Sequence, residues 1–170
     1  YGFYFDFQED NKLMTVADLT TTSATTAKES TYRVRQIMAA TLVFDTYTYL
    51  TMLQDPDPGT YEGVAGQGKG SDVEYEYKRT SGDSIFFAGR RFKKDLVLVK
   101  ATAAQQQSYM GGEYNAAINK LRNFFANTPN PFIPKDGLRY ALTTNHTNKS
   151  ASITALNNGS VLQSVEKFYY

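Results

Sequence analysis

Hydrophobic and polar residues alternate with a period of two along much of the first hundred residues. Phe3, Phe5 and Phe7 are separated by single residues, and after a polar turn at residues 9–12 an apolar run returns at residues 13–16. A period of two is typical of a β-strand with one buried face. Residues 2–17 are therefore predicted to form a β-hairpin.

Further strand-like runs follow, each bounded by turn residues. They lie at residues 30–37, 40–44, 73–77, 84–87 and 95–99. Between them, residues 45–54 fit either a strand or a short helix, and residues 20–26 are expected to be a surface loop. Turns at intervals of about 8 to 12 residues indicate an antiparallel barrel or sandwich.

The pattern changes near residue 102. Residues 101–110 favour a helix, and residues 113–127 have apolar side chains three, four and seven positions apart, which predicts an amphipathic helix. The apolar face consists of Tyr114, Ala117, Ile118, Leu121 and Phe125. Strand patterns then return at residues 138–143, 151–155 and 161–168, with a predicted turn at residues 157–159.

Composition and charge exclude several classes of function. The chain has 170 residues, of which 41% are hydrophobic, so it can bury a core. Its formal net charge of +1 provides no basic surplus for general nucleic-acid binding. Without cysteine it has no disulfide or thiolate metal site, and a single histidine, His146, excludes a multi-histidine zinc site within this chain. No apolar run is long enough to span a membrane.

A glycine-rich stretch at residues 61–71 contains Gly63, Gly68 and Lys69 at the spacing of a phosphate-binding loop. In such loops the next residue is Ser or Thr, whose hydroxyl holds Mg²⁺, but here it is Gly70. The stretch also leads into a predicted strand, whereas a phosphate loop opens a helix. We interpret it as a flexible connection and not as a nucleotide site.

Asp55 and Asp57 lie in an acidic loop that could offer oxygen ligands to calcium. The loop lacks the regular alternate spacing of calcium ligands, and Pro56 and Pro58 already explain a rigid turn. Whether a calcium ion binds there is left open by the sequence.

Other charged groups favour solvated surfaces over catalysis. Glu74 and Glu76 share one strand face with Lys78, which indicates an exposed surface rather than two carboxylates converging in a cleft. The basic segment at residues 90–94 is flanked by acids and is interpreted as a solvated turn. His146 lies in a Thr/Asn-rich turn, where an exposed side chain is expected rather than a catalytic base.

The chain is rich in aromatic residues, with 13 Tyr, 11 Phe and no Trp. Most of them are expected to pack within β-sheets. Four lie at predicted strand ends or in loops and are the candidate ligand or partner contacts: Tyr47, Tyr49, Tyr61 and Phe92. Exposed rings at such positions could stack on a sugar or form the rim of a binding site.

Several stretches resemble a Bacteroidota surface-lipoprotein family of unknown function. The first are residues 30–37 (STYRVRQI), 41–50 (TLVFDTYTYL) and 53–56 (LQDP). After the glycine-rich loop, the resemblance continues through residues 71–75 (SDVEY) and 83–89 (DSIFFAG). In all it covers roughly residues 1–103.

The resemblance implies a lipocalin-like β-barrel in an accessory lipoprotein of the outer membrane. Such proteins are encoded beside TonB-dependent importers of the starch-utilisation type, sometimes together with a zinc metallohydrolase lipoprotein. The resemblance therefore implies a surface-exposed location, with a lipid anchor upstream of this segment. It provides no catalytic residue that can be carried over.

We therefore predict a mainly β protein in three parts. Residues 1–101 form a lipocalin-like antiparallel barrel that is incomplete at its N-terminus, residues 102–135 form a helical connector, and residues 136–170 begin a second, incomplete β unit. Both ends of the chain are strand-like aromatic runs, so we expect a piece of a longer protein. The expected barrel core is Phe3, Phe5, Phe7, Leu42, Phe44, Val73, Tyr75, Tyr77, Ile85 and Leu96 or Val97.

The leading functional hypothesis is a non-enzymatic accessory surface lipoprotein of a nutrient-import complex. It would contact the outer-membrane importer and other surface lipoproteins, with capture of cargo as an additional role, and would need no cofactor. One alternative is a glycan- or peptide-binding module. Another is a hydrolase whose active site lies outside this segment, which an assay on the full-length protein with and without chelator would test.

Overall fold

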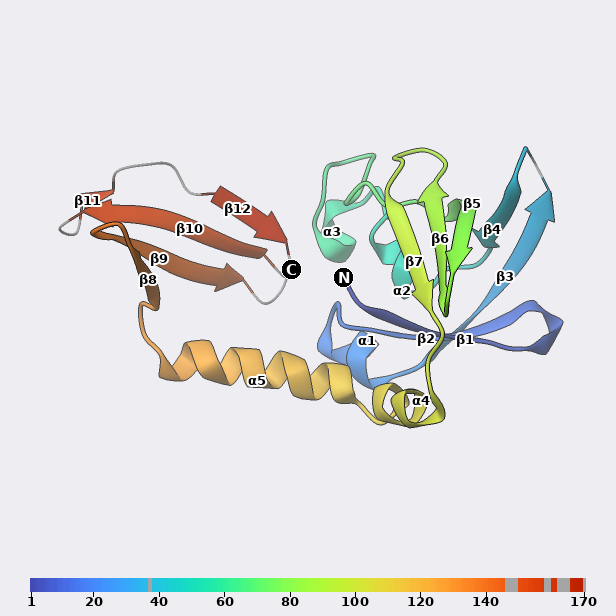
Figure 1. Ribbon diagram of the computed structural model, residues 1–170, viewed down its shortest axis with the longest axis horizontal. Coiled ribbons are helices and arrows are strands. Elements are labelled where there is room, and N and C mark those ends of the chain that lie inside the picture. Colours follow the sequence, from blue (N-terminus) through green and yellow to red (C-terminus); the bar gives the residue numbers. More distant parts are fainter. Residues whose placement is uncertain (37, 146–149, 158–159, 162–165, 170) are drawn as a thin grey trace. The chain divides into compact units, whose positions relative to one another are not determined.

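The computed structural model describes residues 1–36, 38–145, 150–157, 160–161 and 166–169 (Figure 1). These residues are mainly β. They form two compact units, one of Gly2–Tyr114 and one of Asn115–Tyr170 together with Tyr1. The division falls near the start of the longest helix, within the predicted connector.

The first unit is built on a seven-stranded antiparallel sheet in which each strand pairs with the next in sequence. Its strands are β1 (Phe3–Phe7), β2 (Lys12–Ala17), β3 (Lys28–Gln36), β4 (Ala40–Phe44), β5 (Glu74–Ser81), β6 (Ser84–Gly89) and β7 (Asp95–Val99). This order confirms the predicted succession of hairpins. The sheet curls into a half-barrel, and among the described pairings β1 and β7 are its two separate edges (Figure 1).

The main hydrophobic core lines the inner face of this curled sheet. Leu13, Leu42, Phe44, Tyr75 and Phe87 are buried there together with Leu50 from a helix. The ring of Phe44 lies 5.3 Å from that of Phe5 and 6.1 Å from that of Tyr75, so aromatic contacts join strands that are distant in sequence. The predicted core positions confirmed here are Phe3, Phe5, Leu42, Phe44, Val73, Tyr75 and Leu96.

Three predicted core positions are wrong, because their side chains are exposed: Phe7, Tyr77 and Ile85. Of the alternatives Leu96 and Val97, Leu96 packs against the core and Val97 is exposed. Phe7, Tyr77 and Ile85 alternate in phase with buried neighbours but lie toward the end of the sheet that carries the β1–β2 and β5–β6 turns. Val97 lies on the face opposite to Leu96, as alternation requires. A period of two identifies the inner face of a strand but not where along it the core ends.

Three short helices lie in the connections at the opposite end of the sheet: α1 (Thr21–Thr25), α2 (Tyr49–Met52) and α3 (Pro58–Tyr61). Residues 45–54 therefore include a helix and not a strand. A second core joins α2 and α3 to β2, and its buried members are Ala17, Leu19, Tyr49, Leu53 and Tyr61. A short 3-10 helix, η1 (Glu9–Asn11), forms the β1–β2 turn.

The prediction of a surface loop at residues 20–26 is wrong, because this stretch forms α1. The Thr20 hydroxyl accepts a hydrogen bond from the Ser23 backbone N–H at 3.1 Å, and the Ser23 hydroxyl accepts one from the Thr20 N–H at 2.8 Å. This reciprocal capping box satisfies N–H groups that a helix start leaves without partners. Ser23 and Ala24 are buried, so tertiary packing completes the helix.

Helices α4 (Ala103–Met110) and α5 (Glu113–Asn127) confirm the two predicted helices. The Tyr109 ring stacks on Tyr4 of β1 at 5.6 Å and on Tyr114 at 4.9 Å. On the predicted apolar face, Tyr114, Ile118, Leu121 and Phe125 are half-buried and Ala117 is exposed. No helix in the described part of the chain is long and apolar enough to cross a membrane.

The second unit contains a smaller antiparallel sheet that follows most of α5. Its strands are β8 (Phe132–Lys135), β9 (Leu138–Asn145), β10 (Ser150–Asn157), β11 (Ser160–Val161) and β12 (Glu166–Tyr169), in the order β11-β10-β9-β8 with β12 also on β10. Strand β8 lies within residues 102–135, which were predicted to be a helical connector, so that prediction is wrong for Phe132–Lys135. Its Pro134 is a residue that central strands exclude. The strand pairs with β9 at the sheet edge, where proline is tolerated.

Some predicted features lie outside the described residues. They are Ile37 at the end of one predicted strand, His146, the turn residues Asn158 and Gly159, and residues 162–165 of the last predicted strand.

Candidate functional site

An open cleft of about 560 Å³ lies in the first unit, at the end of the sheet where β4 leads to β5 and β6 leads to β7. Its walls come from residues 44–47, from Thr51 and residues 54–56, and from Gly66, Val73 and Arg91. These stretches are separated in sequence and meet because an up-and-down sheet places alternate connections at the same end. The cleft combines two carboxylates, neutral polar groups, two aromatic rings and one guanidinium group.

Tyr47 is the exposed aromatic ring of the cleft, with 48% of its surface accessible. Its hydroxyl donates a hydrogen bond to Oδ2 of Asp55 at 3.2 Å, and the Lys28 ammonium lies 4.5 Å from the ring centroid. Partial burial, and then the neighbouring Asp55 carboxylate, raise the pKa of Tyr47 above its ordinary value of 10.0. The phenol therefore stays protonated at neutral pH and fixes one wall of the cleft.

The acids of residues 55–57 support the backbone of the turn. Asp55 Oδ1 accepts a hydrogen bond from the Asp57 N–H at 2.9 Å, and Asp57 Oδ1 accepts one from the Gly59 N–H at 2.8 Å. Asp57 is thereby the N-cap of α3. In the described part of the chain, no three acidic or histidine side chains gather as a metal site.

The glycine-rich stretch is held by backbone hydrogen bonds, so its interpretation as a flexible connection is wrong. The Lys69 N–H donates to the Leu53 carbonyl at 2.7 Å, and the Gly66 N–H donates to the Pro56 carbonyl at 3.0 Å. Gly68 has a φ of +61°, and a Cβ there would lie 2.7 Å from the Leu53 carbonyl oxygen. Glycine is thus required for this approach, and the stretch forms a wall of the cleft.

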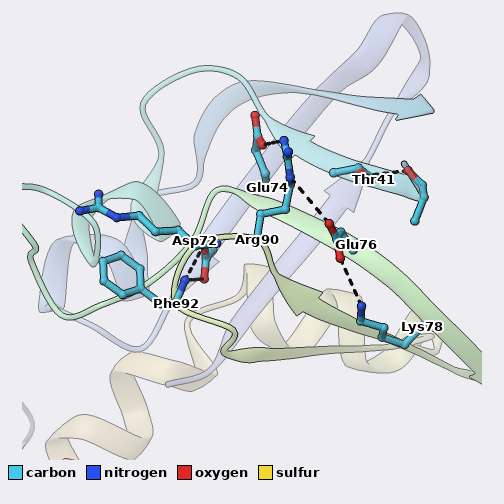
Figure 2. A network of polar contacts seen from close by, with 9 residues as sticks. Thr41, Asp72, Glu74, Glu76, Lys78, Arg90 and Phe92 are labelled. Carbon is cyan, nitrogen blue, oxygen red and sulfur yellow. Dashed lines mark hydrogen bonds and ion pairs between the residues drawn. The ribbon is translucent and has the colours of Figure 1, made fainter. Parts of the chain in front are cut away.

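A buried carboxylate, Asp72, holds the loop that carries Arg91 (Figure 2). Only 3% of the surface of Asp72 is exposed. Its Oδ1 accepts a hydrogen bond from the Arg91 N–H at 2.7 Å, and its Oδ2 accepts one from the Phe92 N–H at 3.1 Å. The sequence interpretation missed this role, although Asp72 and Gly89, which packs against it, both belong to stretches that carry the family resemblance.

Glu74 and Glu76 form an ion-paired surface, as expected for a solvated strand face (Figure 2). Arg90 pairs with Glu74 and lies 3.8 Å from Glu76, and the Lys78 ammonium lies 3.2 Å from Glu76. Each carboxylate therefore faces a cation rather than the other carboxylate. Ion pairs at this exposure contribute little to stability.

The four candidate aromatic residues have different environments. Tyr47 lines the cleft, and Phe92 is half-buried with the Arg91 guanidinium 4.7 Å from its ring centroid. Tyr49 and Tyr61 are only 7% and 5% exposed, so the expectation of exposed rings is wrong for both. Their hydroxyls donate to the carbonyls of Thr26 and Leu19, which allows tyrosines from loops to join the second core.

Comparison with known proteins identifies a family but no activity. No curated protein matches the chain, and no solved structure does. The family model described as "Domain of unknown function (DUF4302)" matches residues 1–170. Because this match extends over the whole sequence, the chain belongs to the DUF4302 family of domains of unknown function.

Proposed function

We propose that this protein is a non-enzymatic accessory component of an outer-membrane nutrient-import complex. It acts by contact with the importer and with other surface lipoproteins and captures cargo, while a lipid anchor upstream of this segment holds it on the cell surface. The resemblance to a Bacteroidota surface-lipoprotein family supports the location and the partners.

The observation that carries the proposal is the position of the stretches with that resemblance. Residues 44–47, residues 54–56 and Val73 come from three such stretches and line one cleft. Asp72 and Gly89, from the same set of stretches, hold the loop of Arg91 at this cleft. Residues that serve only to fill a core would be spread along the inner face of the sheet. Their convergence at an open cleft favours a contact site.

We further propose that the first unit is most of a lipocalin-like barrel. Its up-and-down strand order, its curl and a core on the inner face all fit that architecture. In such a barrel the loops at one end carry the variable contacts, which is where the cleft lies.

Purification from native outer membranes tests the proposed function. An affinity-tagged full-length protein, extracted in mild detergent, is expected to retain a TonB-dependent importer that mass spectrometry identifies. A Tyr47→Ala/Arg91→Ala variant should retain less of it, whereas Arg79→Ala, outside the cleft lining, should not differ. Recovery of the protein alone in every preparation would contradict the proposal.

A glycan-binding module is the second candidate, and the exposed ring of Tyr47 beside polar side chains favours it. Sugars present apolar C–H faces to aromatic rings and hydroxyls to polar groups. A glycan array probed with the intact chain tests this candidate. Binding that Tyr47→Ala abolishes would support it, and an array without signal would remove it.

A further inference from the structure

Arg91 differs from the other arginines near the cleft in having no carboxylate partner. Arg33 pairs with Asp45, and Arg90 pairs with Glu74. Throughout the residues that the structure describes, no ion pair is formed by Arg91, although its side chain lines the cleft and is exposed. Its guanidinium group is therefore available to a ligand that carries negative charge.

The backbone of Arg91 is held in place by an unusual arrangement. Burying a carboxylate such as Asp72 is unfavourable unless hydrogen bonds compensate for the lost water. Asp72 receives these bonds from the N–H groups of Arg91 and Phe92. The Gly89 N–H closes the same loop by donating to the Lys94 carbonyl at 2.8 Å. The side chain of Arg91, which lines the cleft, is therefore attached to a backbone that hydrogen bonds hold in place.

Among the other polar residues of the cleft, Asp45 is paired with Arg33, whereas Gln54 and Asp55 keep hydrogen-bonding capacity for a ligand. The side-chain amide of Gln54 has no partner within the described portion of the chain, and it lines the cleft together with Asp55. Each Asp55 oxygen already accepts one hydrogen bond and keeps a second lone pair. Beside them lies the exposed ring of Tyr47.

We propose that the cleft binds an acidic oligosaccharide, with a sugar carboxylate on Arg91. A planar guanidinium group matches the two oxygens of a carboxylate, and its charge strengthens both hydrogen bonds. Gln54 and Asp55 then meet the hydroxyls of the sugar, and Tyr47 meets its C–H face. This inference deepens the proposed function and rests on it, because it names the class of cargo.

The cleft lining favours a sugar over the C-terminus of a peptide, which also presents a carboxylate. A peptide needs apolar pockets for its side chains, and Phe44, the large apolar residue of the lining, is itself buried in the core. The remaining apolar members of the lining, Pro56 and Val73, are small, and the other side chains there are polar or charged, with the ring of Tyr47 among them.

Calorimetric titration of the intact 170-residue chain tests this inference with three probes. They are trigalacturonic acid, the neutral trisaccharide galactotriose, and triglycine as a source of a peptide carboxylate. Trigalacturonic acid is expected to bind most tightly, and its affinity should fall as salt is added. Tighter binding of triglycine or galactotriose would overturn the inference, as would no binding of trigalacturonic acid.

Substitutions then locate the carboxylate. Arg91→Ala is expected to weaken trigalacturonic acid binding by about tenfold to a hundredfold, which is the usual range for a charge-assisted hydrogen-bonding pair. Arg91→Lys keeps the charge but loses the planar fork, so its affinity should be intermediate. Arg79→Ala is the matched control, because the Arg79 guanidinium lies 3.6 Å from the Phe86 ring and outside the cleft lining. Unchanged affinity in Arg91→Ala would overturn the assignment.

Asp72→Asn separates positioning from direct contact. It retains the shape of the side chain but removes its charge, so the amides of Arg91 and Phe92 should exchange hydrogen for deuterium faster. The affinity for trigalacturonic acid should then fall more than that for galactotriose. An unchanged affinity ratio despite faster exchange would contradict the positioning role. Whether the unsubstituted full-length protein retains the importer tests the proposed function separately, because that result needs neither a change at Arg91 nor an acidic sugar.

Discussion

The carboxylate of Asp72 occupies the space that any side chain at residue 89 would need. A Cβ built on Gly89 would lie 2.0 Å from Oδ2 of Asp72 and 2.4 Å from its Cγ. Gly89 ends β6 and Asp72 precedes β5, so the two residues meet only in the folded sheet. Their contact allows a buried carboxylate to reach the backbone of the 90–94 loop.

Gly89→Ala is therefore expected to destabilise the first unit by about 2 kcal/mol or more, because the added methyl overlaps Asp72 and the structure must move. Chemical denaturation followed by circular dichroism measures the change in free energy of unfolding. In an Asp72→Ala background, which removes the carboxyl atoms that lie 2.0 and 2.4 Å away, the same substitution should cost less. Equal costs in both backgrounds would show that the contact is not the cause.

The two glycines Gly66 and Gly68 provide a matched pair within the glycine-rich stretch. Both have positive φ values, +80° and +61°, but nothing lies within 4 Å of a Cβ at Gly66. Gly66→Ala should therefore cost only about 1 kcal/mol of backbone strain. Gly68→Ala should cost more, because its Cβ would lie 2.8 Å from the Asp55 carbonyl oxygen. Denaturation midpoints of the two variants test this order, and the reverse order would disprove a packed wall.

Tyr47 and Tyr49 should respond differently to truncation although they are two residues apart. Tyr49→Ala removes a buried ring and its hydrogen bond to Thr26, so a loss of about 3 kcal/mol or more is expected. Tyr47→Ala, at an exposed ring, should change stability by less than about 1 kcal/mol and should reduce ligand binding. Thermal unfolding and calorimetric titration measure the two effects. A strong stability loss in Tyr47→Ala would argue for a structural role.

Stability is expected to fall at alkaline pH. Burial, as the largest cause, raises the pKa values of Tyr75 and Tyr114 above the ordinary value of 10.0. The unfolded chain then loses these protons first, so the stabilisation is complete below pH about 10 and is lost as pH rises further. Urea denaturation at several pH values above and below 10 measures this loss. Tyr114→Phe keeps the ring but has no ionisable proton. The variant should therefore lose less unfolding free energy above pH 10 than the parent chain does.

The N-cap of α1 offers a test on a local scale. Thr20→Ala removes the acceptor of the Ser23 N–H and should cost about 1 kcal/mol. Thr22→Ala, on the exposed side of the same helix, is the control and should change stability by less than about 0.5 kcal/mol. A comparison of the two unfolding free energies tests the cap, and equal effects would contradict it.

The sequence alone was sufficient to predict most of the strands and the two longer helices. In residues 3–17, 84–99 and 113–127 the signal is local, since period-two or 3.6-residue spacing and turn residues lie within one stretch. Local signals were weaker where helices are short. Four of the five residues of α1 are polar, so the helix shows no apolar periodicity, and its formation is explained by its capping box and the burial of Ala24. Strand β8 was missed for the opposite reason, because Pro134 argues against a strand except at an edge.

Only the tertiary structure decided which side chains form the cleft. Tyr47 and Tyr49 have the same local pattern, yet one ring is exposed and the other is buried, because α2 turns Tyr49 toward the second core. Asp72 and Arg91 are brought together by the pairing of β5 with β6, which no local periodicity encodes. Periodicity determines which face of an element is buried, whereas the meeting of distant loops depends on how the whole sheet is paired and curled.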